Sequence, residues 1–572
     1  MDAKQEYARW SGMQLEDVAL SQELATIAGD DDAINDRFWR DLEFGTGGLR
    51  GVIGAGANRM NVYTVRKATQ GLADYLCASF AAPSVCIAYD TRNMSREFAQ
   101  AAAGVFCANG IQTWLFDDVR PTPMLSFAVR HKGASAGIVL TASHNPKEYN
   151  GYKVYGSDGG QITDEAAATI LNRIAACDVF TDAKTMPIED ALASGTLQIV
   201  GEDVDAPYYE KVKALVIRKD LVASRASDLK IIYSPLHGSG NVPVRRVLRE
   251  LGFTNVAIVP EQERPDGNFS TTPYPNPEEP AVYALAIEMA KKTNPDLIFA
   301  TDPDCDRIGV LVKNEVGELS VLTGNQVGAL LCDYRIRTMK ELGSLPDNAA
   351  VIKTIVTTDL AKSICGENGV ALVNTLTGFK YIGEKIGEWE NDHSHSFLFG
   401  FEESYGYLAG NFVRDKDAVI AAMLIAEMAL YYREQGLSLF QAMDALYQRY
   451  GYTAEKLMSI SMPGQEGQQQ ITEMIAGLRV NYKTLLAEEN LAVFEDYKQS
   501  VRVNVATSAQ ESIVLPTSNV LKFIFEDGSW LVLRPSGTEP KIKIYLAAAG
   551  DSAEVVTRRM ATLEKLGQRL TN

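Results

Sequence analysis

The sequence lacks paired cysteines and any excess of positive charge. Its seven cysteines form no Cys-x-x-Cys pair, and most stand in apolar stretches where a thiol is a small core residue, which predicts a reducing compartment. The 55 Lys and Arg residues face 73 Asp and Glu residues, and the resulting net charge of −18 would repel DNA or an anionic membrane. We therefore expect no nucleic-acid partner, although this average still permits a local basic pocket.

Long apolar runs are also missing. The first residues, MDAKQEYARWSGM, carry charges where a signal peptide needs an apolar core. The most apolar stretch, residues 418–432, contains Glu427 and is shorter than the ~20 residues that span a bilayer, so it predicts a buried helix. A chain of 572 residues with 46% hydrophobic content predicts several domains, about four by length. We expect a cytoplasmic, multidomain protein.

Three segments repeat one pattern: a β-branched strand, a polar loop, an apolar-periodic helix closed by Gly, and a second short strand. The segments are residues 84–116, 229–259 and 349–374. Strands that alternate with helices indicate parallel α/β layers, and the three recurrences predict three related α/β domains.

The C-terminal part follows a different pattern. A polar, Gln-rich segment at residues 463–470 precedes a helix-like stretch, and two strands then flank an Asp527-Gly528 turn. A final amphipathic helix is expected from Ser552 onward. This pattern predicts a fourth domain of the α+β class. The expected domains are residues 1–219, 220–320, 321–447 and 448–572.

The motif DPDCDR at residues 302–307 follows the apolar strand LIFA. In an extended segment Asp302, Asp304 and Asp306 project to one side, at the carboxyl end of a strand, where α/β proteins build sites. Oxygen-only ligands indicate a hard divalent ion, Mg²⁺ above all. An EF-hand loop is excluded because Arg307 and Lys313 stand where that loop needs Gly and Glu.

The motif TASHNP at residues 141–146 follows the strand GIVL, and it places a Ser hydroxyl at that strand's carboxyl end. Ser143 and His144 are adjacent, so in an extended loop their side chains are expected to point apart, and no ordinary Ser–His dyad is assumed. Lys153 follows closely. Ser135 stands in a formal G-x-S-x-G match but precedes a strand, which excludes the nucleophile-elbow context.

Three further loops carry groups suited to a phosphosugar. Residues 534–541 (RPSGTEPK) combine a guanidinium, hydroxyls and Gly-enabled backbone N–H groups that can surround a phosphate; a plain turn fits equally well. Residues 400–406 (GFEESYG) offer carboxylates and a hydroxyl to sugar hydroxyls, with an exposed acidic turn as the alternative. Residues 44–51 (FGTGGLRG) match neither the dinucleotide-binding nor the Walker pattern, and they present Arg50 to an anion.

Together these motifs resemble the α-D-phosphohexomutase family, in the family's order. TASHNP is similar to its phosphoserine loop, DPDCDR to its Mg²⁺ loop, GFEESYG to its sugar-binding loop and RPSGT to its phosphate-binding loop. FGTGGLRG, LTGFKYI at residues 376–382 and the extension before Phe44 are most similar to a branch of bacterial α-phosphoglucomutases and phosphopentomutase-like mammalian paralogues. Gly406 stands where the bifunctional phosphomannomutases have His. The resemblance implies three similar α/β domains and a C-terminal α+β domain, heart-shaped around a central cleft.

The resemblance also implies the reaction. Glucose 1-phosphate and glucose 6-phosphate would interconvert through a phosphoserine at Ser143 and a glucose 1,6-bisphosphate intermediate, which also serves as activator. One Mg²⁺ would be bound by Asp302, Asp304, Asp306 and an oxygen of the phosphorylated Ser143. The expected partner is a small phosphosugar, with no nucleic acid and no membrane, and the expected assembly is a monomer or a homodimer.

The general base stays open among His144, Lys153 and Arg50. A guanidinium is almost never deprotonated, so Arg50 is better suited to stabilising charge, and Lys153 would need a pKa lowered by burial and nearby cations. The residues that the resemblance implies in substrate binding are Thr46, Arg307, Lys353, Thr377, Gly378, Lys380, Glu402, Ser404, Lys416, Arg534, Ser536, Gly537 and Thr538.

Other functions remain as alternatives. The similarity to the phosphopentomutase-like branch favours a phosphopentomutase or a glucose-1,6-bisphosphate synthase as the runner-up, and a phosphomannomutase ranks lower. The Asp-x-Asp of residues 302–304 also fits a haloacid-dehalogenase-type phosphatase with Asp302 as nucleophile. A non-enzymatic descendant of the family is a further alternative, although such a chain would be free to lose Ser143 and Arg534.

Overall fold

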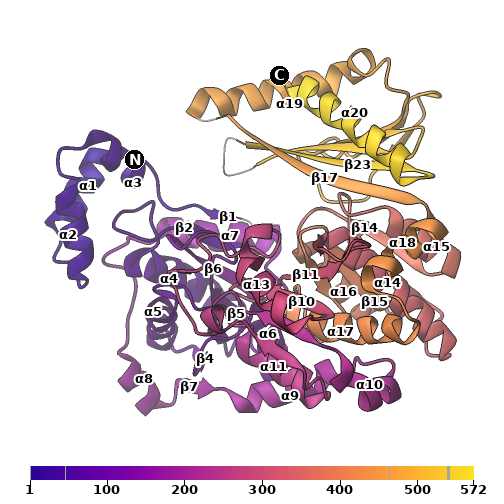
Figure 1. The fold of residues 1–572 in the computed structure, drawn as a ribbon. Coiled ribbons are helices and arrows are strands. Elements are labelled where there is room, and N and C mark those ends of the chain that lie inside the picture. The colour runs from indigo at the N-terminus through magenta and orange to yellow at the C-terminus, as the bar shows by residue number, and fades with distance from the viewer. Residues whose placement is uncertain (1, 46, 463, 537–540, 572) are drawn as a thin grey trace.

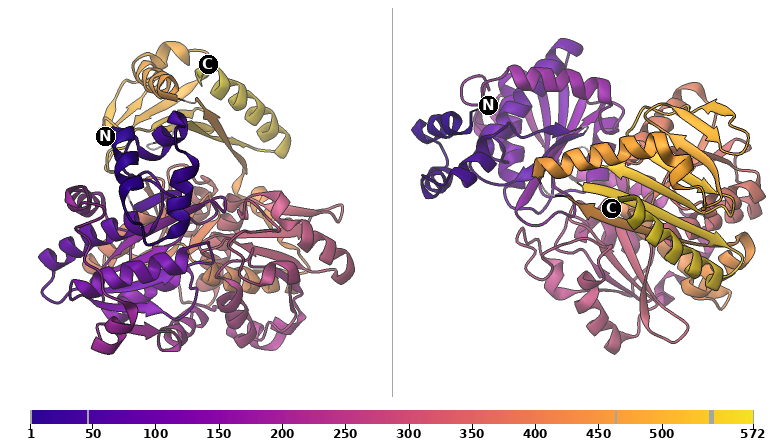
Figure 2. Two further views of the ribbon diagram at one scale, coloured as in Figure 1. Left: turned by 90° about the vertical axis from the view of Figure 1, so that its left-hand side faces the viewer. Right: turned by 90° about the horizontal axis from the view of Figure 1, so that it is seen from above.

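The computed structural model describes residues 2–45, 47–462, 464–536 and 541–571. Within these ranges the strands form four sheets, which the chain builds in order from its N-terminus (Figure 1 and Figure 2). The sheets hold residues 44–200, 231–322, 349–408 and 452–550, and we name the first to fourth domains after them. No helix in the described part of the chain is long and apolar enough to cross a membrane. The expected multidomain α/β architecture is confirmed, whereas the expected domain boundaries stay predictions.

Three helices before the first sheet form a small bundle at the edge of the molecule (Figure 1). Trp10 and Phe38 are fully buried in this bundle, with ring centroids 6.0 Å apart. Trp10 also contacts Tyr63 edge-on, at 5.7 Å between centroids, so aromatic packing attaches the bundle to the first domain. The helices are α1 (Ala3–Gly12), α2 (Val18–Thr26) and α3 (Asp31–Phe38).

The first domain surrounds a seven-stranded sheet of order β1-β2-β6-β5-β3-β4-β7. Its strands are β1 (Phe44–Gly45), β2 (Gly48–Val52), β3 (Ser84–Tyr89), β4 (Gln112–Phe116), β5 (Ala136–Leu140), β6 (Tyr149–Gly156) and β7 (Leu197–Val200). Its helices are α4 (Val62–Ser79), α5 (Ser95–Ala108), α6 (Thr122–Lys132), α7 (Asp164–Ala176), α8 (Ile188–Ser194) and α9 (Glu202–Lys213). The link to the second domain contains α10 (Lys219–Arg225) and the 3₁₀ turn η1 (Ala226–Asp228).

The second and third domains are smaller. The second contains β8 (Ile231–Ser234), α11 (Asn241–Glu250), β9 (Val256–Ile258), α12 (Pro260–Glu263), η2 (Pro280–Tyr283), α13 (Ala284–Thr293), β10 (Leu297–Thr301), β11 (Ile308–Lys313) and β12 (Leu319–Leu322). The third contains α14 (Gly324–Glu341), β13 (Ala349–Thr354), α15 (Leu360–Asn368), β14 (Ala371–Thr375), α16 (Phe379–Asp392), β15 (Ser396–Glu402), β16 (Gly406–Leu408), α17 (Ala418–Glu434) and α18 (Leu439–Tyr450).

The first three sheets share one arrangement of four strands. A central strand pairs in parallel with the strand that follows its helix: β3 with β4, β8 with β9, and β13 with β14. On its other side it pairs in parallel with a third strand, which is β5, β10 or β15. That third strand pairs antiparallel with the next strand in the chain, β6, β11 or β16. The three repeated β-α-β segments expected from the sequence are confirmed.

This arrangement gives three sequence motifs equivalent positions. TASHNP follows β5, DPDCDR follows β10, and GFEESYG covers the end of β15 and the loop after it. Each loop contains one non-glycine residue in the left-handed region: Ser143 at φ 51°, Cys305 at φ 52° and Tyr405 at φ 65°. A left-handed residue with a side chain costs about 1–2 kcal/mol, so contacts around each loop must hold it in place.

Helix α17 lies where the first three domains meet. It contacts α9, α11 and α14, and its apolar residues from Ala418 to Leu430 are at most 6% exposed. Asp417 caps its N-terminus by accepting hydrogen bonds from Ile420 N at 2.9 Å and from the Tyr208 hydroxyl at 2.8 Å. The buried helix expected at residues 418–432 is confirmed, and it fixes the residues just before it.

The fourth domain places two helices on one face of an antiparallel sheet (Figure 1). Its elements are β17 (Tyr452–Ser461), α19 (Gly464–Leu485), β18 (Leu491–Asp496), β19 (Val501–Asn504), β20 (Gln510–Ser512), β21 (Leu521–Phe525), β22 (Trp530–Pro535), β23 (Lys541–Gly550) and α20 (Ala553–Thr571). The strands flanking the Asp527-Gly528 turn and the C-terminal helix are confirmed. The Gln-rich segment was expected to precede the helix, but it forms the first turns of α19, which begins at Gly464. Gln has good helix propensity, and the core-facing Ile471 continues the same helix.

The two faces of this sheet have different neighbours because side chains alternate along a strand. Leu531 and Leu533 of β22 belong to the core under the helices. Trp530 and Val532 belong to a second cluster, which includes Ile355 of the third domain. The fourth domain is therefore attached to the third through the sheet face opposite its helices.

Lys522 lies within this attachment. It is 6% exposed, and its Nζ donates a hydrogen bond of 2.7 Å to Ile355 O and lies 4.5 Å from the centre of the Trp530 ring. Burial lowers the pKa of Lys522 to about 8, although Asp359 opposes this shift. The attachment of the two domains thus includes a buried amine whose pKa of about 8 is well below that of an exposed lysine.

We predict that Lys522 makes stability rise with pH over a defined window. Its folded pKa of about 8 lies below the ordinary 10.5, so between these values only the unfolded chain binds the proton. The melting temperature of the wild type relative to Lys522→Met should therefore increase from pH 8 to 10.5 and stay flat below pH 8. The exposed Lys498→Met variant should follow the wild type. If the difference in melting temperature between the wild type and Lys522→Met were the same at every pH in this window, the prediction would be contradicted.

Candidate active site

Three buried carboxylates form the centre of the candidate site. Asp302, Asp304 and Asp306 are at most 2% exposed, and one oxygen from each lies within 4.8 Å of the others. The loop folds around Asp302, whose Oδ1 accepts hydrogen bonds from Asp306 N at 3.1 Å and Arg307 N at 3.0 Å. The convergence that the sequence predicts for these carboxylates is present in the structure.

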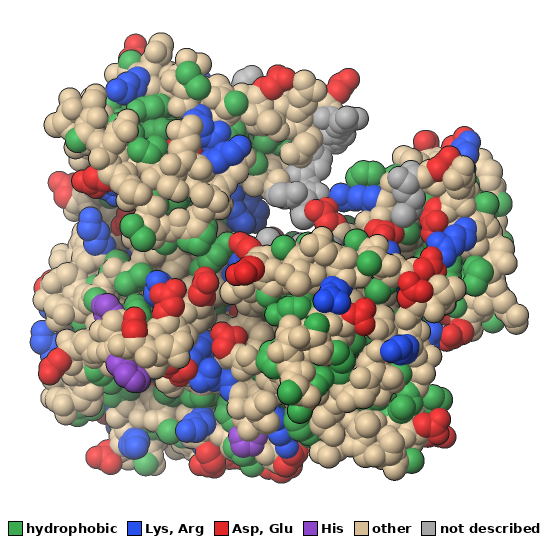
Figure 3. Space-filling model, turned by 180° about the vertical axis from the view of Figure 1, so that it is seen from behind, with side chains coloured by type: hydrophobic (Ala, Val, Ile, Leu, Met, Phe, Trp, Pro, Cys, Tyr) green, Lys and Arg blue, Asp and Glu red, His purple; other side chains and the backbone are tan. Residues whose placement is uncertain are grey.

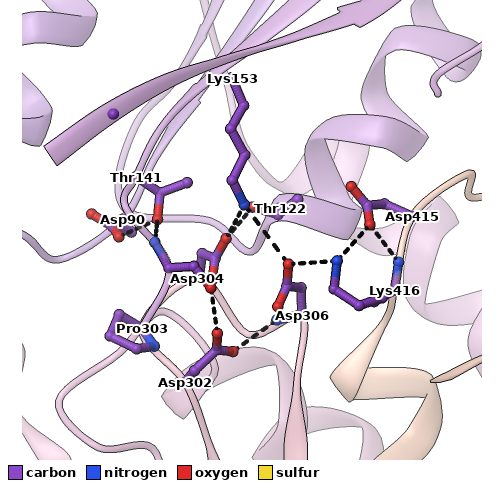
Figure 4. A network of polar contacts seen from close by, with 12 residues as sticks. Asp90, Thr122, Thr141, Lys153, Asp302, Pro303, Asp304, Asp306, Asp415 and Lys416 are labelled. Atoms are coloured by element: carbon purple, nitrogen blue, oxygen red, sulfur yellow. Dashed lines mark hydrogen bonds and ion pairs between the residues drawn. The ribbon is translucent and has the colours of Figure 1, made fainter. Parts of the chain in front are cut away.

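Cations from two other domains reach this cluster (Figure 4). Lys153 Nζ, from β6 of the first domain, lies 2.8 Å from Asp304 Oδ2 and 3.7 Å from Asp306 Oδ2. Lys416 Nζ, just before α17 of the third domain, lies 3.2 Å from Asp306 Oδ2 and 3.1 Å from Asp415 Oδ1. The acidic loop is thus compensated across two domain interfaces.

Neighbouring carboxylates keep both lysines in the charged form, which makes them poor general bases. Burial favours a neutral Lys153, but Asp304 and Asp306 outweigh it and raise the pKa of Lys153 above its usual value. Burial likewise opposes a charged Lys416, and Asp306 and Asp415 raise its pKa. The lowered pKa that a basic Lys153 requires is therefore absent in this structure. Burial, with the two neighbouring carboxylates, raises the pKa of Asp302 well above its usual range.

The donor set fits Mg²⁺. Among the described side chains, Asp304 Oδ1 and Asp306 Oδ1 are buried and have no hydrogen-bond partner. A buried carboxylate oxygen without a partner is costly unless a cation binds it, and all-oxygen ligands suit a hard divalent ion. Asp302, Asp304 and Asp306 are the residues that would bind it.

Ser143 faces the carboxylates. Its Oγ donates a hydrogen bond of 2.8 Å to Asp302 Oδ2, and the residue is 4% exposed. His144 Nδ1 lies 3.3 Å from the same Oγ, which corrects the expectation that the two side chains point apart. The expectation assumed an extended loop, but Ser143 has φ 51° and the turn brings its neighbour's ring back. Burial, then Arg307 and Arg50, lowers the pKa of His144 well below its usual value and keeps the ring neutral.

Arg50 and Arg307 lie near this centre. Arg50 Nη1 donates to Asn145 Oδ1 at 3.3 Å and, together with Lys153, lines a pocket of about 610 Å³ on the first domain. Arg307 Nη1 donates to Glu278 Oε1 at 2.6 Å. Figure 3 shows the molecule hollowed between the fourth domain and the N-terminal part. The pocket on the first domain is lined by Arg40, Arg50, Arg59 and Lys153, with Asp36 and Glu43 beside them.

The sugar-loop residues occupy the corresponding edge of the third domain. Ser404 Oγ donates 2.9 Å to Glu402 Oε1, and an isolated β-bridge joins Arg307 to Gly406. The metal loop and the sugar loop are therefore adjacent. Glu403 is half-buried, and its desolvation, together with Glu402 next to it, raises the pKa of Glu403 to about 7.

Other expected site residues lie further from the carboxylates or outside the description. Lys353 is 1% exposed, donates to Thr357 O at 3.0 Å and pairs with Asp359 at 2.9 Å, so it supports the third domain near the fourth. Lys380 pairs with Asp164 of the first domain at 2.6 Å. Gly378, with φ 120°, precedes α16, next to Thr377. Arg534 lies in β22 and Ser536 just after it. Thr46, Gly537 and Thr538 lie outside the described residues.

Two residues around the carboxylate cluster were missed from the sequence, one that contacts a carboxylate and one that contacts Lys416. Thr122, at the start of α6, donates from its Oγ1 to Asp304 Oδ2 at 2.8 Å and from its N to Asp304 O at 2.9 Å. Asp415 fixes Lys416, in a segment singled out only for its lysine. A threonine after a proline carries no signal for a partner 182 residues away. Ser135 Oγ accepts a hydrogen bond of 3.2 Å from Ser84 N at the start of β3, as expected of a structural serine.

Three α/β domains that present a serine, a cluster of three carboxylates and the loop of residues 400–406, with a fourth domain beside them, have the architecture of the phosphohexomutase class of enzymes. The chain belongs to the phosphoglucomutase/phosphomannomutase family. Models of this family's α/β/α domains I, II and III match residues 41–179, 206–317 and 323–450, and the model of its C-terminal domain matches residues 479–565.

Curated relatives and solved structures agree with this assignment. The chain is 38% identical over 521 residues to a phosphoglucomutase of Staphylococcus haemolyticus, covering 91% of this chain and 93% of the relative. It is 36% identical over 515 residues to a phosphoglucomutase of Staphylococcus aureus, covering 89% and 90%. The fold matches parafusin, a phosphoglucomutase from Paramecium, with TM-score 0.68 at 18% identity over 93% of this chain and 94% of that one. A family protein from Burkholderia thailandensis gives TM-score 0.66 at 18% identity, over 92% and 97%.

We predict that Asp304→Asn weakens Mg²⁺ binding about 100-fold, because it removes one negative charge and replaces one carboxylate oxygen of the donor set with an amide nitrogen. Isothermal titration with MgCl₂ measures the change. Asp333→Asn is the matched control, since Asp333 is also a buried carboxylate (2% exposed) but lies in α14, outside the cluster. Equal Mg²⁺ affinity in Asp304→Asn and the wild type would show that the cluster is no metal site.

Proposed function

We propose that this chain is an isomerase that interconverts glucose 1-phosphate and glucose 6-phosphate by passing a phosphoryl group through Ser143. The observation that carries the proposal is the position of Ser143 Oγ, which is buried and 2.8 Å from Asp302 in a cluster of three carboxylates. The curated relatives that are 36–38% identical over about nine-tenths of the chain bear the name phosphoglucomutase. A small phosphosugar is the substrate class that the family supports.

In the proposed reaction the phosphorylated Ser143 gives its phosphoryl group to a free hydroxyl of the sugar. The bond from phosphorus to Ser143 Oγ breaks, a bond from phosphorus to the sugar oxygen forms, and the hydroxyl proton passes through a base to the departing Ser143 Oγ. His144 is the base in this proposal because its Nδ1 contacts Ser143 Oγ, whereas Lys153 is engaged by two carboxylates. The product is glucose 1,6-bisphosphate, which reverses its orientation and returns its other phosphoryl group to Ser143.

The surrounding residues would stabilise the charge on the transferring phosphoryl group and orient the sugar. Bound Mg²⁺ would neutralise negative charge on the transferring phosphoryl group. Lys153 and Lys416 add fixed positive charge at the same place, within 3.7 Å of the carboxylates. Glu402 and Ser404 can accept from and donate to sugar hydroxyls in either orientation. Arg534, Ser536 and, in the undescribed turn, Gly537 and Thr538 would hold the distant phosphate.

Three further parts belong to this proposal. Glucose 1,6-bisphosphate would phosphorylate an unphosphorylated enzyme and so act as its activator. We also propose a cytoplasmic location, in keeping with the free thiols of all seven cysteines. Selection of glucose over ribose or mannose is assigned to Glu402 and Ser404, and a phosphopentomutase is the second candidate.

We predict that Ser143→Ala lowers kcat for glucose 1-phosphate at least about 1,000-fold, because the phosphoryl acceptor is lost. Ser135→Ala, which removes the hydroxyl of another buried serine, should retain wild-type kcat. A coupled assay that detects glucose 6-phosphate measures both variants in the presence of the bisphosphate. Full activity in Ser143→Ala would exclude a phosphoserine mechanism.

We also predict the largest kcat/KM for glucose 1-phosphate when it competes with mannose 1-phosphate and ribose 1-phosphate. Product analysis of a mixture containing all three substrates gives the ratios directly. A preference of tenfold or more for ribose 1-phosphate would replace the proposed function with a phosphopentomutase.

A further inference from the structure

One buried guanidinium holds the loop that carries Ser143. Arg92 lies between β3 and α5, and its side chain is 0% exposed. Its Nη1 donates to Pro146 O at 2.9 Å and to Tyr149 O at 3.1 Å. Its Nη2 donates to Ser143 O and to Asn145 O. A single side chain therefore engages four backbone carbonyls across seven residues of the loop.

The same segment also fixes the other backbone group of Ser143. Ser143 N donates a hydrogen bond of 2.8 Å to Thr141 Oγ1, and Thr141 Oγ1 donates 2.6 Å to Asp90 Oδ2. Asp90 in turn accepts from Arg92 N at 2.9 Å and from Ser95 Oγ at 2.7 Å. Both backbone polar groups of Ser143 are thus held by the residues that follow β3, directly or through Thr141.

These contacts hold a backbone conformation that Ser143 would otherwise avoid. With φ 51°, Ser143 adopts the left-handed region, at a cost of about 1–2 kcal/mol for a residue with a side chain. The same conformation directs Oγ to Asp302 at 2.8 Å. Without the four carbonyl contacts the cost of this conformation is no longer offset, so the loop is expected to move away from it. A displacement of about 1 Å at a reacting atom can cost about 100-fold in rate.

The second domain covers the guanidinium. The Phe269 ring centre lies 5.0 Å from Arg92 Cζ. Asn93 Nδ2 donates 3.1 Å to Asn268 Oδ1, and a Cβ on Gly267 would lie 2.6 Å from Asn93 N. The close approach requires glycine at position 267 and brings Phe269 over Arg92, where it excludes water from the hydrogen bonds to the loop.

We propose that Arg92 is the positioning residue for the proposed phosphoryl transfer: it sets the Ser143 backbone through four carbonyls, and Phe269 of the second domain seals it. Arg92 acts through the loop and does not itself contact the reacting oxygen. Lysine cannot replace it, since one ammonium has a single donor centre where the guanidinium presents a planar fork to two pairs of carbonyls. This inference rests on the proposed function.

The test compares Arg92→Lys with Arg335→Lys. Arg335 is 4% exposed in α14 and belongs to the third domain, so its variant controls for the loss of any buried guanidinium. We expect Arg92→Lys to lower kcat about 100-fold while KM for glucose 1-phosphate stays within about threefold, and Arg335→Lys to keep wild-type kcat. Phe269→Leu, which thins the cover and leaves Arg92 in place, should lower kcat about tenfold with the same KM.

Chemical rescue separates positioning from folding. Millimolar guanidinium chloride should raise kcat of Arg92→Ala at least about tenfold and leave Arg335→Ala unchanged. The proposal is overturned if Arg92→Lys keeps kcat within threefold of wild type, if KM rises in step with the loss of kcat, or if guanidinium fails to rescue Arg92→Ala. Wild-type protein assayed in parallel separates a failure of the proposed function from a failure of the role of Arg92. A wild type that isomerises no sugar phosphate contradicts the proposed function. An active wild type with an equally active Arg92→Lys contradicts only the role of Arg92.

Discussion

The burial of three carboxylates in one loop is the constraint on which the rest of the structure depends. Asp302, Asp304 and Asp306 lie close together and almost fully out of water. Like charges in that position are unfavourable unless cations compensate them, and here the cations come from other domains. Lys153 belongs to the first domain and Lys416 to the third. The site therefore exists only while these three domains are in contact, and its electrostatics help to hold them together.

The repeated fold explains how the domains can share one site. In each of the first three domains the loop after the third strand lies at the carboxyl edge of the sheet, and each loop contains one left-handed residue. Three copies of one arrangement, packed around α17, bring Ser143, the carboxylate cluster and the loop of residues 400–406 next to one another. The fourth domain is attached differently, through the apolar face that carries Trp530 and the buried amine of Lys522.

Much of this was accessible from the sequence because it depends on local patterns. Hydrophobic periodicity predicted the three β-α-β units, and the spacing of Asp302, Asp304 and Asp306 after a strand predicted their convergence. What the sequence could not supply depends on tertiary contacts. The left-handed turn at Ser143, which brings His144 against its hydroxyl, follows from contacts with Arg92 and Thr141. The raised pKa of Lys153 likewise follows from carboxylates in another domain.

The central claim is that Ser143 passes a phosphoryl group between sugar oxygens and that the phosphoryl group is not released to water. A single-turnover experiment tests this most directly: protein labelled with radioactive phosphate on Ser143 is mixed with unlabelled glucose 1-phosphate, and the label is followed over time. The account predicts that the label moves into hexose bisphosphate and hexose phosphate. Release of the label as inorganic phosphate, or its retention on the protein, would contradict it.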